Sequence, residues 1–279
     1  MNVNNPIKNS RRMSPWMIVY PLFIYFGICQ ILNMILPVLV QIDEVKRLGI
    51  NNIVAFLVLY IVFIRPLKKE NGLFTAEPFL DASEQKSLFF THITGHSVRG
   101  ICVAIALMSA AGIAFNNVLA MIEVKELSES YQMVEQAFYA ADLMWELLVL
   151  GIVTPLVEEV LYRYLIFFHL KKSQGTIGAV CLTAVIFGVM HFNIVQAIYA
   201  SALGMLLGAL MAYYDDIRVP VVGHMAANLI VLLRSETGIL EFLSSEKNYY
   251  IPVTVVLLVL ILAVSLVLFK KLAKNCADK

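Results

Sequence analysis

The chain has 279 residues, of which 60% are hydrophobic and only 15% charged, and its mean hydropathy is +0.79. Soluble domains carry about 25% charged residues, so the composition excludes an ordinary soluble protein. The net charge of +1 gives no basis for binding nucleic acid. Long apolar runs separated by short charged patches predict an all-α, polytopic membrane bundle, because β-barrel strands would alternate in segments of about ten residues.

We predict eight membrane-spanning helices. In chain order the expected spans are Trp16–Val40, Ile50–Ile64, Ile101–Ile122, Ala140–Leu170, Thr176–Phe192, Ile194–Tyr214, Val219–Leu233 and Ile251–Phe269. A span needs about 20 residues. By that rule the second and seventh are short and the fourth is long.

The spans divide the chain into three parts. Residues 1–137 hold the first three helices and a polar loop, 65–97. Residues 138–233 hold helices four to seven, and residues 234–279 hold the last helix and a basic tail. No eukaryotic sorting signal is evident, which favours a multi-pass protein of a bacterial cell membrane.

Lysine and arginine set the expected orientation. If the N-terminus is cytoplasmic, 15 of the 21 lysines and arginines fall in inner segments, five in outer segments and one within a span. Inner segments of membrane proteins carry the excess of these residues. The bias therefore predicts that both termini are cytoplasmic.

A cluster of two glutamates and an arginine lies inside the fourth expected span. Ionisable groups in hydrocarbon are costly and usually functional. Glu159 and Arg163 are four apart on a helix, so they can pair on one face. Glu158 points about 100° away and needs a partner from another helix or from water. The cluster indicates either a general base or a salt bridge and a protonated glutamate that hold the bundle together.

Two histidines and an asparagine follow in later spans. His191 lies at the end of the fifth, and His224 and Asn228 share a face of the seventh. Such groups can simply hydrogen-bond packed helices to one another. They can also hold a water, a metal ion or a substrate carbonyl, or stabilise an oxyanion.

Read together, these patterns resemble a known family. Glu158-Glu159 with Arg163, then Phe187-x-x-x-His191, then His224-x-x-x-Asn228 resemble the CPBP family of CAAX-protease and bacteriocin-processing (Abi) intramembrane endopeptidases. The resemblance covers about residues 148–230. It implies a glutamate-dependent peptidase that hydrolyses a peptide bond of a membrane-associated peptide, or of a prenylated or leader-bearing substrate.

The resemblance also implies roles for the residues. Glu158 would activate the water, while His191, His224 and Asn228 would bind the water, a metal or the oxyanion. Glu159 and Arg163 would support them. A metal, Zn²⁺ or another divalent ion, would use His191, His224 and Glu159 as ligands, but the sequence has no His-Glu-x-x-His pattern to strengthen that reading.

Two other functions stay open. The helices could form a non-catalytic scaffold or a bacteriocin-immunity protein that binds a peptide or a sensor kinase. A proton-coupled transporter that uses Glu158 is a further alternative, although the sequence shows no repeated halves. The expected partners are a peptide or protein substrate in the membrane and the lipid bilayer.

Some polar residues have simpler explanations. His92 and His96 have a spacing that could bind metal on a helix, but no carboxylate motif lies near them in sequence. Asn116 either lines a wet cavity or marks the end of the third span. Counted as straight helices from the inner charges, Glu158, His191 and His224 would lie at different depths. They could meet if the fifth helix starts late, as Gly175 and Gly178 allow, or if the seventh enters through a dipping loop at Pro220, and helix tilt could supply the rest.

Overall fold

The structure is a computed structural model that describes residues 16–64, 93–123, 128–138, 141–238 and 247–277. All regular structure in these ranges is helical, as predicted. In chain order the elements are α1 (Trp16–Leu39), α2 (Glu44–Leu59), η1 (Tyr60–Ile64), α4 (Gly95–Met121), α6 (Glu129–Phe138), α7 (Leu143–Leu148), η2 (Val149–Val153), α8 (Thr154–Glu159), η3 (Val160–Ile166), α9 (Phe167–Val189), α10 (Ile194–Tyr214), α11 (Arg218–Thr237) and α12 (Lys247–Ala277).

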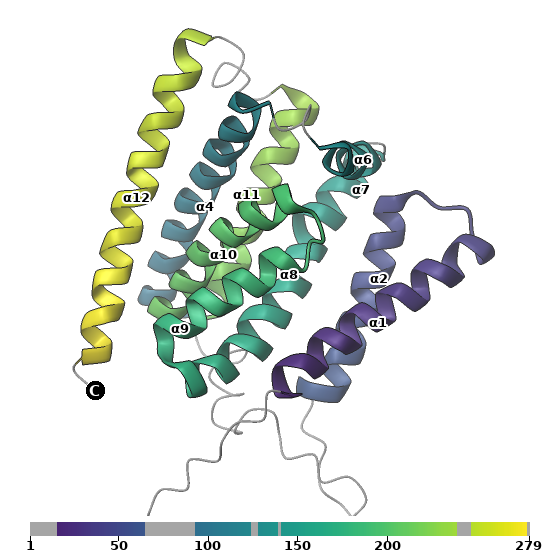
Figure 1. Ribbon diagram of the computed structural model, residues 1–279, viewed down its shortest axis with the longest axis horizontal. Coiled ribbons are helices and arrows are strands. Elements are labelled where there is room, and N and C mark those ends of the chain that lie inside the picture. The colour runs from purple at the N-terminus through teal and green to yellow at the C-terminus, as the bar shows by residue number, and fades with distance from the viewer. Residues whose placement is uncertain (1–15, 65–92, 124–127, 139–140, 239–246, 278–279) are drawn as a thin grey trace, which may run out of the picture.

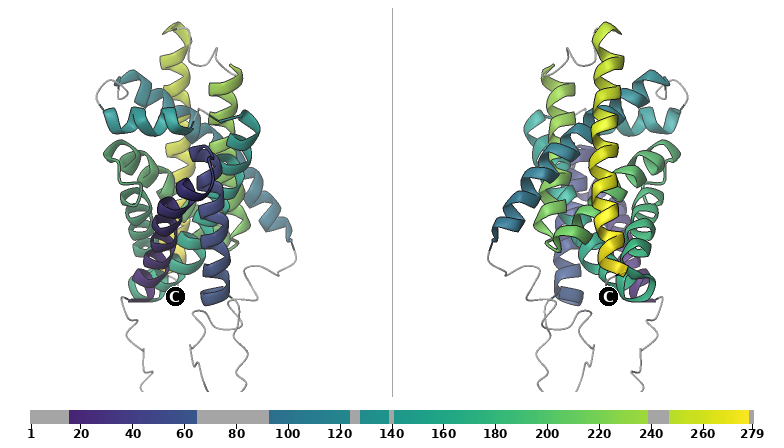
Figure 2. Two further views of the ribbon diagram at one scale, coloured as in Figure 1. Left: turned by 90° about the vertical axis from the view of Figure 1, so that its right-hand side faces the viewer. Right: turned by 90° about the vertical axis from the view of Figure 1, so that its left-hand side faces the viewer.

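The helices form one bundle with a hairpin at its side. Helices α1 and α2 make that hairpin at one edge, and α12 lies at the opposite edge (Figure 1). Between them α4 packs against α11, and α9 packs against α10. Helix α1 begins, and α12 ends, at the same end of the bundle (Figures 1 and 2). This arrangement agrees with termini on one side of a membrane.

Five of the described helices are long and apolar enough to cross a membrane, so the protein is a multi-pass helical membrane protein. They are Ile18–Leu39, Glu44–Ile64, Gly95–Met121, Ile194–Tyr214 and Tyr249–Lys274. The other three expected spans are helical as well, but kinks and polar residues interrupt their apolar runs. Five of the eight predicted spans therefore meet the criterion of length and composition.

The second span is longer than predicted. Helix α2 begins at Glu44, six residues before the expected start, because Asp43 caps it by accepting a hydrogen bond from the backbone N–H of Lys46 at 2.8 Å. Asp43 also pairs with the Lys46 side chain at 2.8 Å. The expectation of a short second span was wrong, since its charged first turn belongs to the helix.

Two other boundaries differ from expectation. The loop predicted at 65–97 lies mostly outside the described residues, and α4 already begins at Gly95. Residues 129–138, expected in an outer loop, form the polar helix α6. Helix α6 is too short and too polar to resemble a span, which is why hydropathy did not reveal it.

The end of α10 and the start of α11 meet at a tight acidic turn. Asp215 has a left-handed backbone (φ 50°). Asp216 accepts hydrogen bonds from the backbone N–H and the guanidinium of Arg218. Burial alone would raise the pKa of Asp216, but hydrogen bonds from Arg218 and Ser97 outweigh burial and hold that pKa below its ordinary value. The turn fixes the start of α11, the helix that carries His224.

Candidate functional site

The two glutamates lie on a short α-helix between two π-helical segments. Helix α8 spans six residues, with η2 before it and η3 after it. π-Segments are rare and frequent at functional sites. Each inserts extra backbone into a turn and changes which side chains face the neighbouring helices. Glu159 is fully buried, while the side chain of Glu158 is 17% exposed.

Pro155 and Asn228 together explain how the backbone carbonyl of Leu150 is hydrogen-bonded. In η2 the N–H of Thr154 bonds to the carbonyl of Val149. The next carbonyl, that of Leu150, would need the N–H of residue 155, which proline lacks. The Asn228 amide donates to the Leu150 carbonyl instead, at 2.9 Å. One amide hydrogen of Asn228 therefore satisfies the backbone, and the second remains for a ligand.

Glu159, Arg163 and His224 form a buried group. Glu159 Oε1 lies 3.1 Å from the Arg163 guanidinium and 2.9 Å from His224 Nδ1. Arg163 is fully buried and also donates to the Gly204 carbonyl at 3.2 Å. The i,i+4 pair predicted from the sequence is therefore present. Glu159 additionally orients the His224 ring, because a proton on Nδ1 leaves Nε2 facing the other way.

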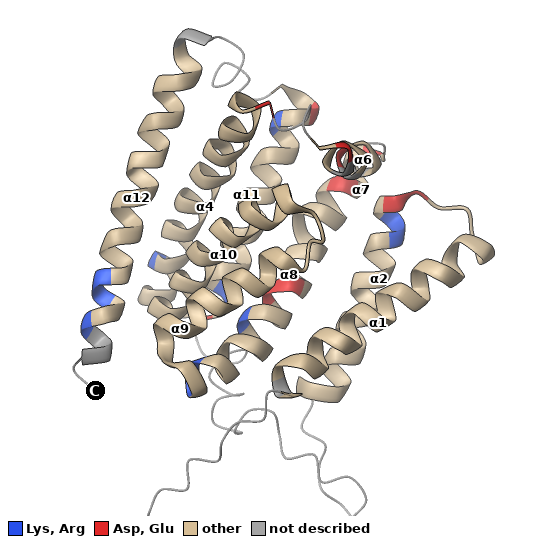
Figure 3. Cartoon of the chain, viewed as in Figure 1, with Lys and Arg blue, Asp and Glu red and all other residues tan. Residues whose placement is uncertain are grey.

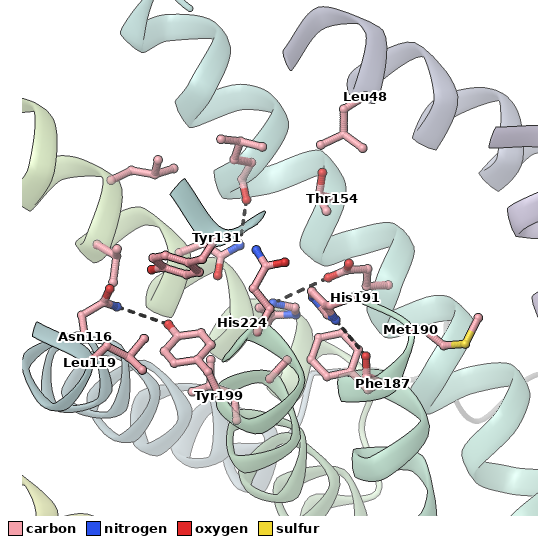
Figure 4. Close-up of a pocket in the computed structure, with 18 of the residues that line it drawn as sticks. Leu48, Asn116, Leu119, Tyr131, Thr154, Phe187, Met190, His191, Tyr199 and His224 are labelled. Atoms are coloured by element: carbon pink, nitrogen blue, oxygen red, sulfur yellow. Dashed lines mark hydrogen bonds and ion pairs between the residues drawn. The ribbon is translucent and has the colours of Figure 1, made fainter. Parts of the chain in front are cut away.

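His224 and Glu158 face each other across a cavity. His224 Nε2 is 3.8 Å from Glu158 Oε2, which is longer than a hydrogen bond. Both groups line a cavity of about 460 Å³ together with His191 and Asn228. Figure 4 shows His191 and His224 on adjoining sides of this cavity. The structure thus brings all four predicted catalytic residues to one cavity.

Phe187 holds the two imidazoles in place. His191 Nδ1 lies 2.8 Å from the Phe187 carbonyl, so the proton belongs on Nδ1 and Nε2 is left as an acceptor. The Phe187 ring packs edge-on against His191 at 5.0 Å and His224 at 5.8 Å between centroids, and the Arg163 guanidinium lies over its face at 4.9 Å. Phe187 therefore fixes the arrangement of three charged or titratable groups.

A strained turn places His191. Helix α9 ends at Val189, and Phe192 has a positive φ of 54°. Asn193 then caps α10 by accepting from the backbone N–H groups of Val195 and Gln196. A bulky residue at positive φ is uncommon and is often found at functional sites.

The predicted mismatch in depth is resolved by the turn at Gly175. This glycine has φ 72° and separates two helical parts within α9. Glu158 lies 17 residues before it and His191 16 residues after it, so both are about 25 Å from the turn. The second part of α9 begins directly after Gly175, at the expected start of the fifth span, so the position of the turn and not a late helix start accounts for the common depth of Glu158 and His191.

Sequence reasoning missed a contribution from the N-terminal hairpin. Tyr25 of α1 lines the cavity and donates to Asn52 Oδ1 of α2 at 2.6 Å. Asn52 is fully buried and donates to Thr154 Oγ1 of α8 at 2.8 Å. This chain of hydrogen bonds joins α1 and α2 to the helix of the glutamates. The signal that could have revealed it is the polar pair Asn51-Asn52 within an apolar span.

The far end of the cavity is lined by neutral polar groups. Asn116, which the sequence placed either in a wet cavity or at a helix end, lines this cavity. It donates to the Gly112 carbonyl at 2.9 Å and to Tyr199 at 3.3 Å. Tyr131 of α6 approaches the same end (Figure 4). The cavity therefore runs from the glutamate and histidines to a neutral hydrogen-bonding region.

The predicted metal ligands do not converge in this arrangement. Glu159 Oε1 is already engaged by His224 and Arg163. Among the residues that the structure describes, no group of three or more His, Cys, Asp or Glu side chains is placed to hold a metal ion. The set His191, His224 and Glu159 thus does not fit a metal here, and His96 lies away from the site beside Tyr214.

These features define a multi-pass helical membrane protein with a carboxylate, imidazole and amide site inside its bundle. Residues 140–230 match the family model described as "Type II CAAX prenyl endopeptidase Rce1-like". The matched segment contains every predicted site residue, and the family resemblance read from the sequence is confirmed.

One curated protein is similar in sequence. It is "Putative membrane peptidase YdiL" of Bacillus subtilis (strain 168), which is 27% identical over 121 residues. The alignment covers 43% of this chain and 49% of the relative, so the chain spans about half the length of the curated relative that it matches. No solved structure matches the chain.

Proposed function

We propose that this protein is an intramembrane endopeptidase that hydrolyses a peptide bond with a water activated by Glu158. The observation that carries the proposal is the 3.8 Å approach of Glu158 to His224 in a cavity that His191 and Asn228 also line. The match of residues 140–230 to the Rce1-like family supports it.

The geometry supports distinct roles for the two glutamates. Glu158 is open to the cavity and has no hydrogen bond to another described side chain, so it can accept a proton from water. Glu159 is buried and is engaged by His224 and Arg163, so it acts as a positioning residue. With one hydrogen of the water directed at Glu158, the other can be donated to the Nε2 atom of His191 or of His224, which would orient the attacking lone pair.

Asn228 is the residue best placed to stabilise the developing oxyanion. One of its amide hydrogens is used by the Leu150 carbonyl, which fixes the side chain. The other can donate to an oxygen in the cavity. A donor held in place before the reaction needs no reorganisation when charge develops. We propose that hydrolysis proceeds by direct water attack through these side chains.

The cavity favours an internal peptide bond over a chain end. No lysine or arginine is among the described residues that line it, and its carboxylate is Glu158. A substrate with a free C-terminal carboxylate at the site would meet a like charge and no cation. An extended internal segment presents neutral amides, which suit Asn116, Gln196 and Tyr199. We propose a membrane-associated peptide, prenylated or leader-bearing, as the substrate.

We further propose that the protein crosses a bacterial cell membrane eight times with both termini in the cytoplasm. The five apolar helices would be joined by the α7–α9 run up to Gly175, the second part of α9, and α11. The polar residues that interrupt or end these three helices include Glu158, His191, His224 and Asn228, which line the cavity. Polar side chains at membrane depth are tolerated where they face a bundle interior or a cavity.

The test compares the wild-type protein with Glu158→Gln in vesicles, using a library of membrane peptides. Loss of a general base should lower the cleavage rate by about 10²–10⁴-fold, with the melting temperature and membrane insertion unchanged. Glu146→Gln is the matched control, because Glu146 is buried in the same helical run but does not line the cavity. Cleavage retained by Glu158→Gln would refute the mechanism. A folded wild-type protein that binds peptides without cutting them would favour the scaffold alternative.

A further inference from the structure

A second groove lies at the end of the bundle where α12 ends. It has a volume of about 410 Å³ and is enclosed by α4, α10 and α12. None of the residues that line this groove also lines the cavity of Glu158, His191, His224 and Asn228. Its lining residues are His96, Arg99, Val103, Tyr213, Tyr214, Ala263, Val264, Val267, Leu268 and Lys271.

The lining is ordered by depth along the helices. On α12, Lys271 lies at the end of the groove nearest the C-terminus of the helix, and Val267 and Val264 lie about 6 and 10 Å farther toward the middle of the helix. On α4, Arg99 lies near the helix start and Val103 about 6 Å deeper. Figure 3 shows that the basic residues of α12 gather near its C-terminal end. The groove is therefore cationic at the membrane boundary and apolar toward the membrane centre.

The cations are not neutralised by the described part of the chain. No aspartate or glutamate of that part lines the groove, and none forms an ion pair with Arg99 or Lys271. Lys271 donates to the Tyr213 hydroxyl at 3.1 Å, and its ammonium lies 5.2 Å from the centre of that ring. His96 packs against Tyr214 at 4.8 Å between ring centres. Two positive charges thus line the groove beside two tyrosines, and one of them, Lys271, is hydrogen-bonded to Tyr213.

We propose that this groove binds one anionic phospholipid. Its phosphate would lie between Arg99 and Lys271, tyrosine hydroxyls would hydrogen-bond the headgroup, and an acyl chain would follow Val264, Val267 and Leu268 into the membrane. Basic pockets between membrane helices at a bilayer boundary recognise anionic headgroups in this way. The start of α4 adds the positive end of a helix dipole to the same site. This inference is independent of the peptidase proposal.

The test measures lipid binding to the purified full-length chain in a neutral detergent. Phosphatidylglycerol and phosphatidylcholine are titrated separately, and bound lipids are counted by native mass spectrometry. We expect one phosphatidylglycerol to bind in preference to phosphatidylcholine. The double variant Arg99→Gln/Lys271→Gln should weaken that binding about 25-fold, because each interfacial cation contributes about fivefold. Both residues are exposed, so the variant should fold.

Lys270→Gln/Lys274→Gln is the matched control. It removes the same charge from the same end of α12, and both lysines are exposed outside the groove. Binding should stay at the wild-type level. An equal loss in this control would show general surface attraction and overturn the proposal. Equal affinity for the two lipids would also overturn the proposal. So would a rise in melting temperature with glycerol phosphate that equals the rise with phosphatidylglycerol, because glycerol phosphate carries the charge without the acyl chains.

Discussion

At the scale of single residues, adjacent glutamates have opposite environments. Glu158 faces the cavity, and Glu159 is fully buried between Arg163 and His224. A one-residue step turns a side chain by about 100° on a helix. That step separates a group available to substrate from a group that orients an imidazole. The pair therefore supplies the base and the positioning residue of the proposed mechanism.

Glu159→Gln should destabilise the protein. It would leave the Arg163 guanidinium, which is fully buried, without its counter-charge. Removing one partner of a buried ion pair costs about 3–5 kcal/mol. We expect a large fall in melting temperature in detergent, with partial recovery in the double variant Glu159→Gln/Arg163→Gln. Additive losses in this double-mutant cycle would show that the two side chains are not coupled.

At the scale of elements, the site depends on irregular helices. The π-segments η2 and η3 flank α8, and Pro155 leaves the Leu150 carbonyl for Asn228. The hairpin of α1 and α2 is tied to the same helix by the Tyr25–Asn52–Thr154 hydrogen bonds. The Asn228–Leu150 hydrogen bond thus replaces one that a regular helix would make within itself, and the side-chain bonds join the hairpin to α8.

Gly188→Ala should disturb the site through the contact of α9 with α10. A Cβ at position 188 would lie 2.0 Å from Ser201 Oγ and 2.3 Å from the Ala197 carbonyl. The two helices must separate, which would move the turn that carries His191. We expect a lower melting temperature and loss of peptide cleavage. Gly27→Ala is the control, because its Cβ meets nothing within 4 Å, and it should leave both properties intact.

At the scale of the whole molecule, charge and apolar length arrange the bundle. The start of α1 and the end of α12 lie at the same end of the bundle (Figures 1 and 2), and the basic residues of α12 gather near that end. A reporter that works only in the cytoplasm should therefore be active when it is fused after Lys279. A reporter that works only outside the cytoplasm should be active when it is inserted after Glu129, in the outer segment. Finding both positions on one side of the membrane would contradict the eight-span topology.

Much of this protein was predictable from sequence because its signals are local. Hydropathy identified a helical membrane protein, and helical spacing identified the Glu159–Arg163 pair, which the structure contains. The order of motifs from Glu158 to Asn228 identified the family, which the comparison of residues 140–230 confirms. These inferences need only composition, periodicity and short spacing, which a single chain displays directly.

Other features were decided only by the tertiary structure. Counting along straight helices misplaced Glu158, His191 and His224, because the turn at Gly175 sets the level of two of them and the packing of α11 against α8 sets the third. Tyr25 and Asn52 carry no motif, and they join the site only because α2 packs against α8 and α1 packs against α2. Arg99 and Lys271 are 172 residues apart in the chain and share one groove. Contacts between distant segments depend on how whole helices pack against one another. Short-range spacing in the sequence does not reveal that packing.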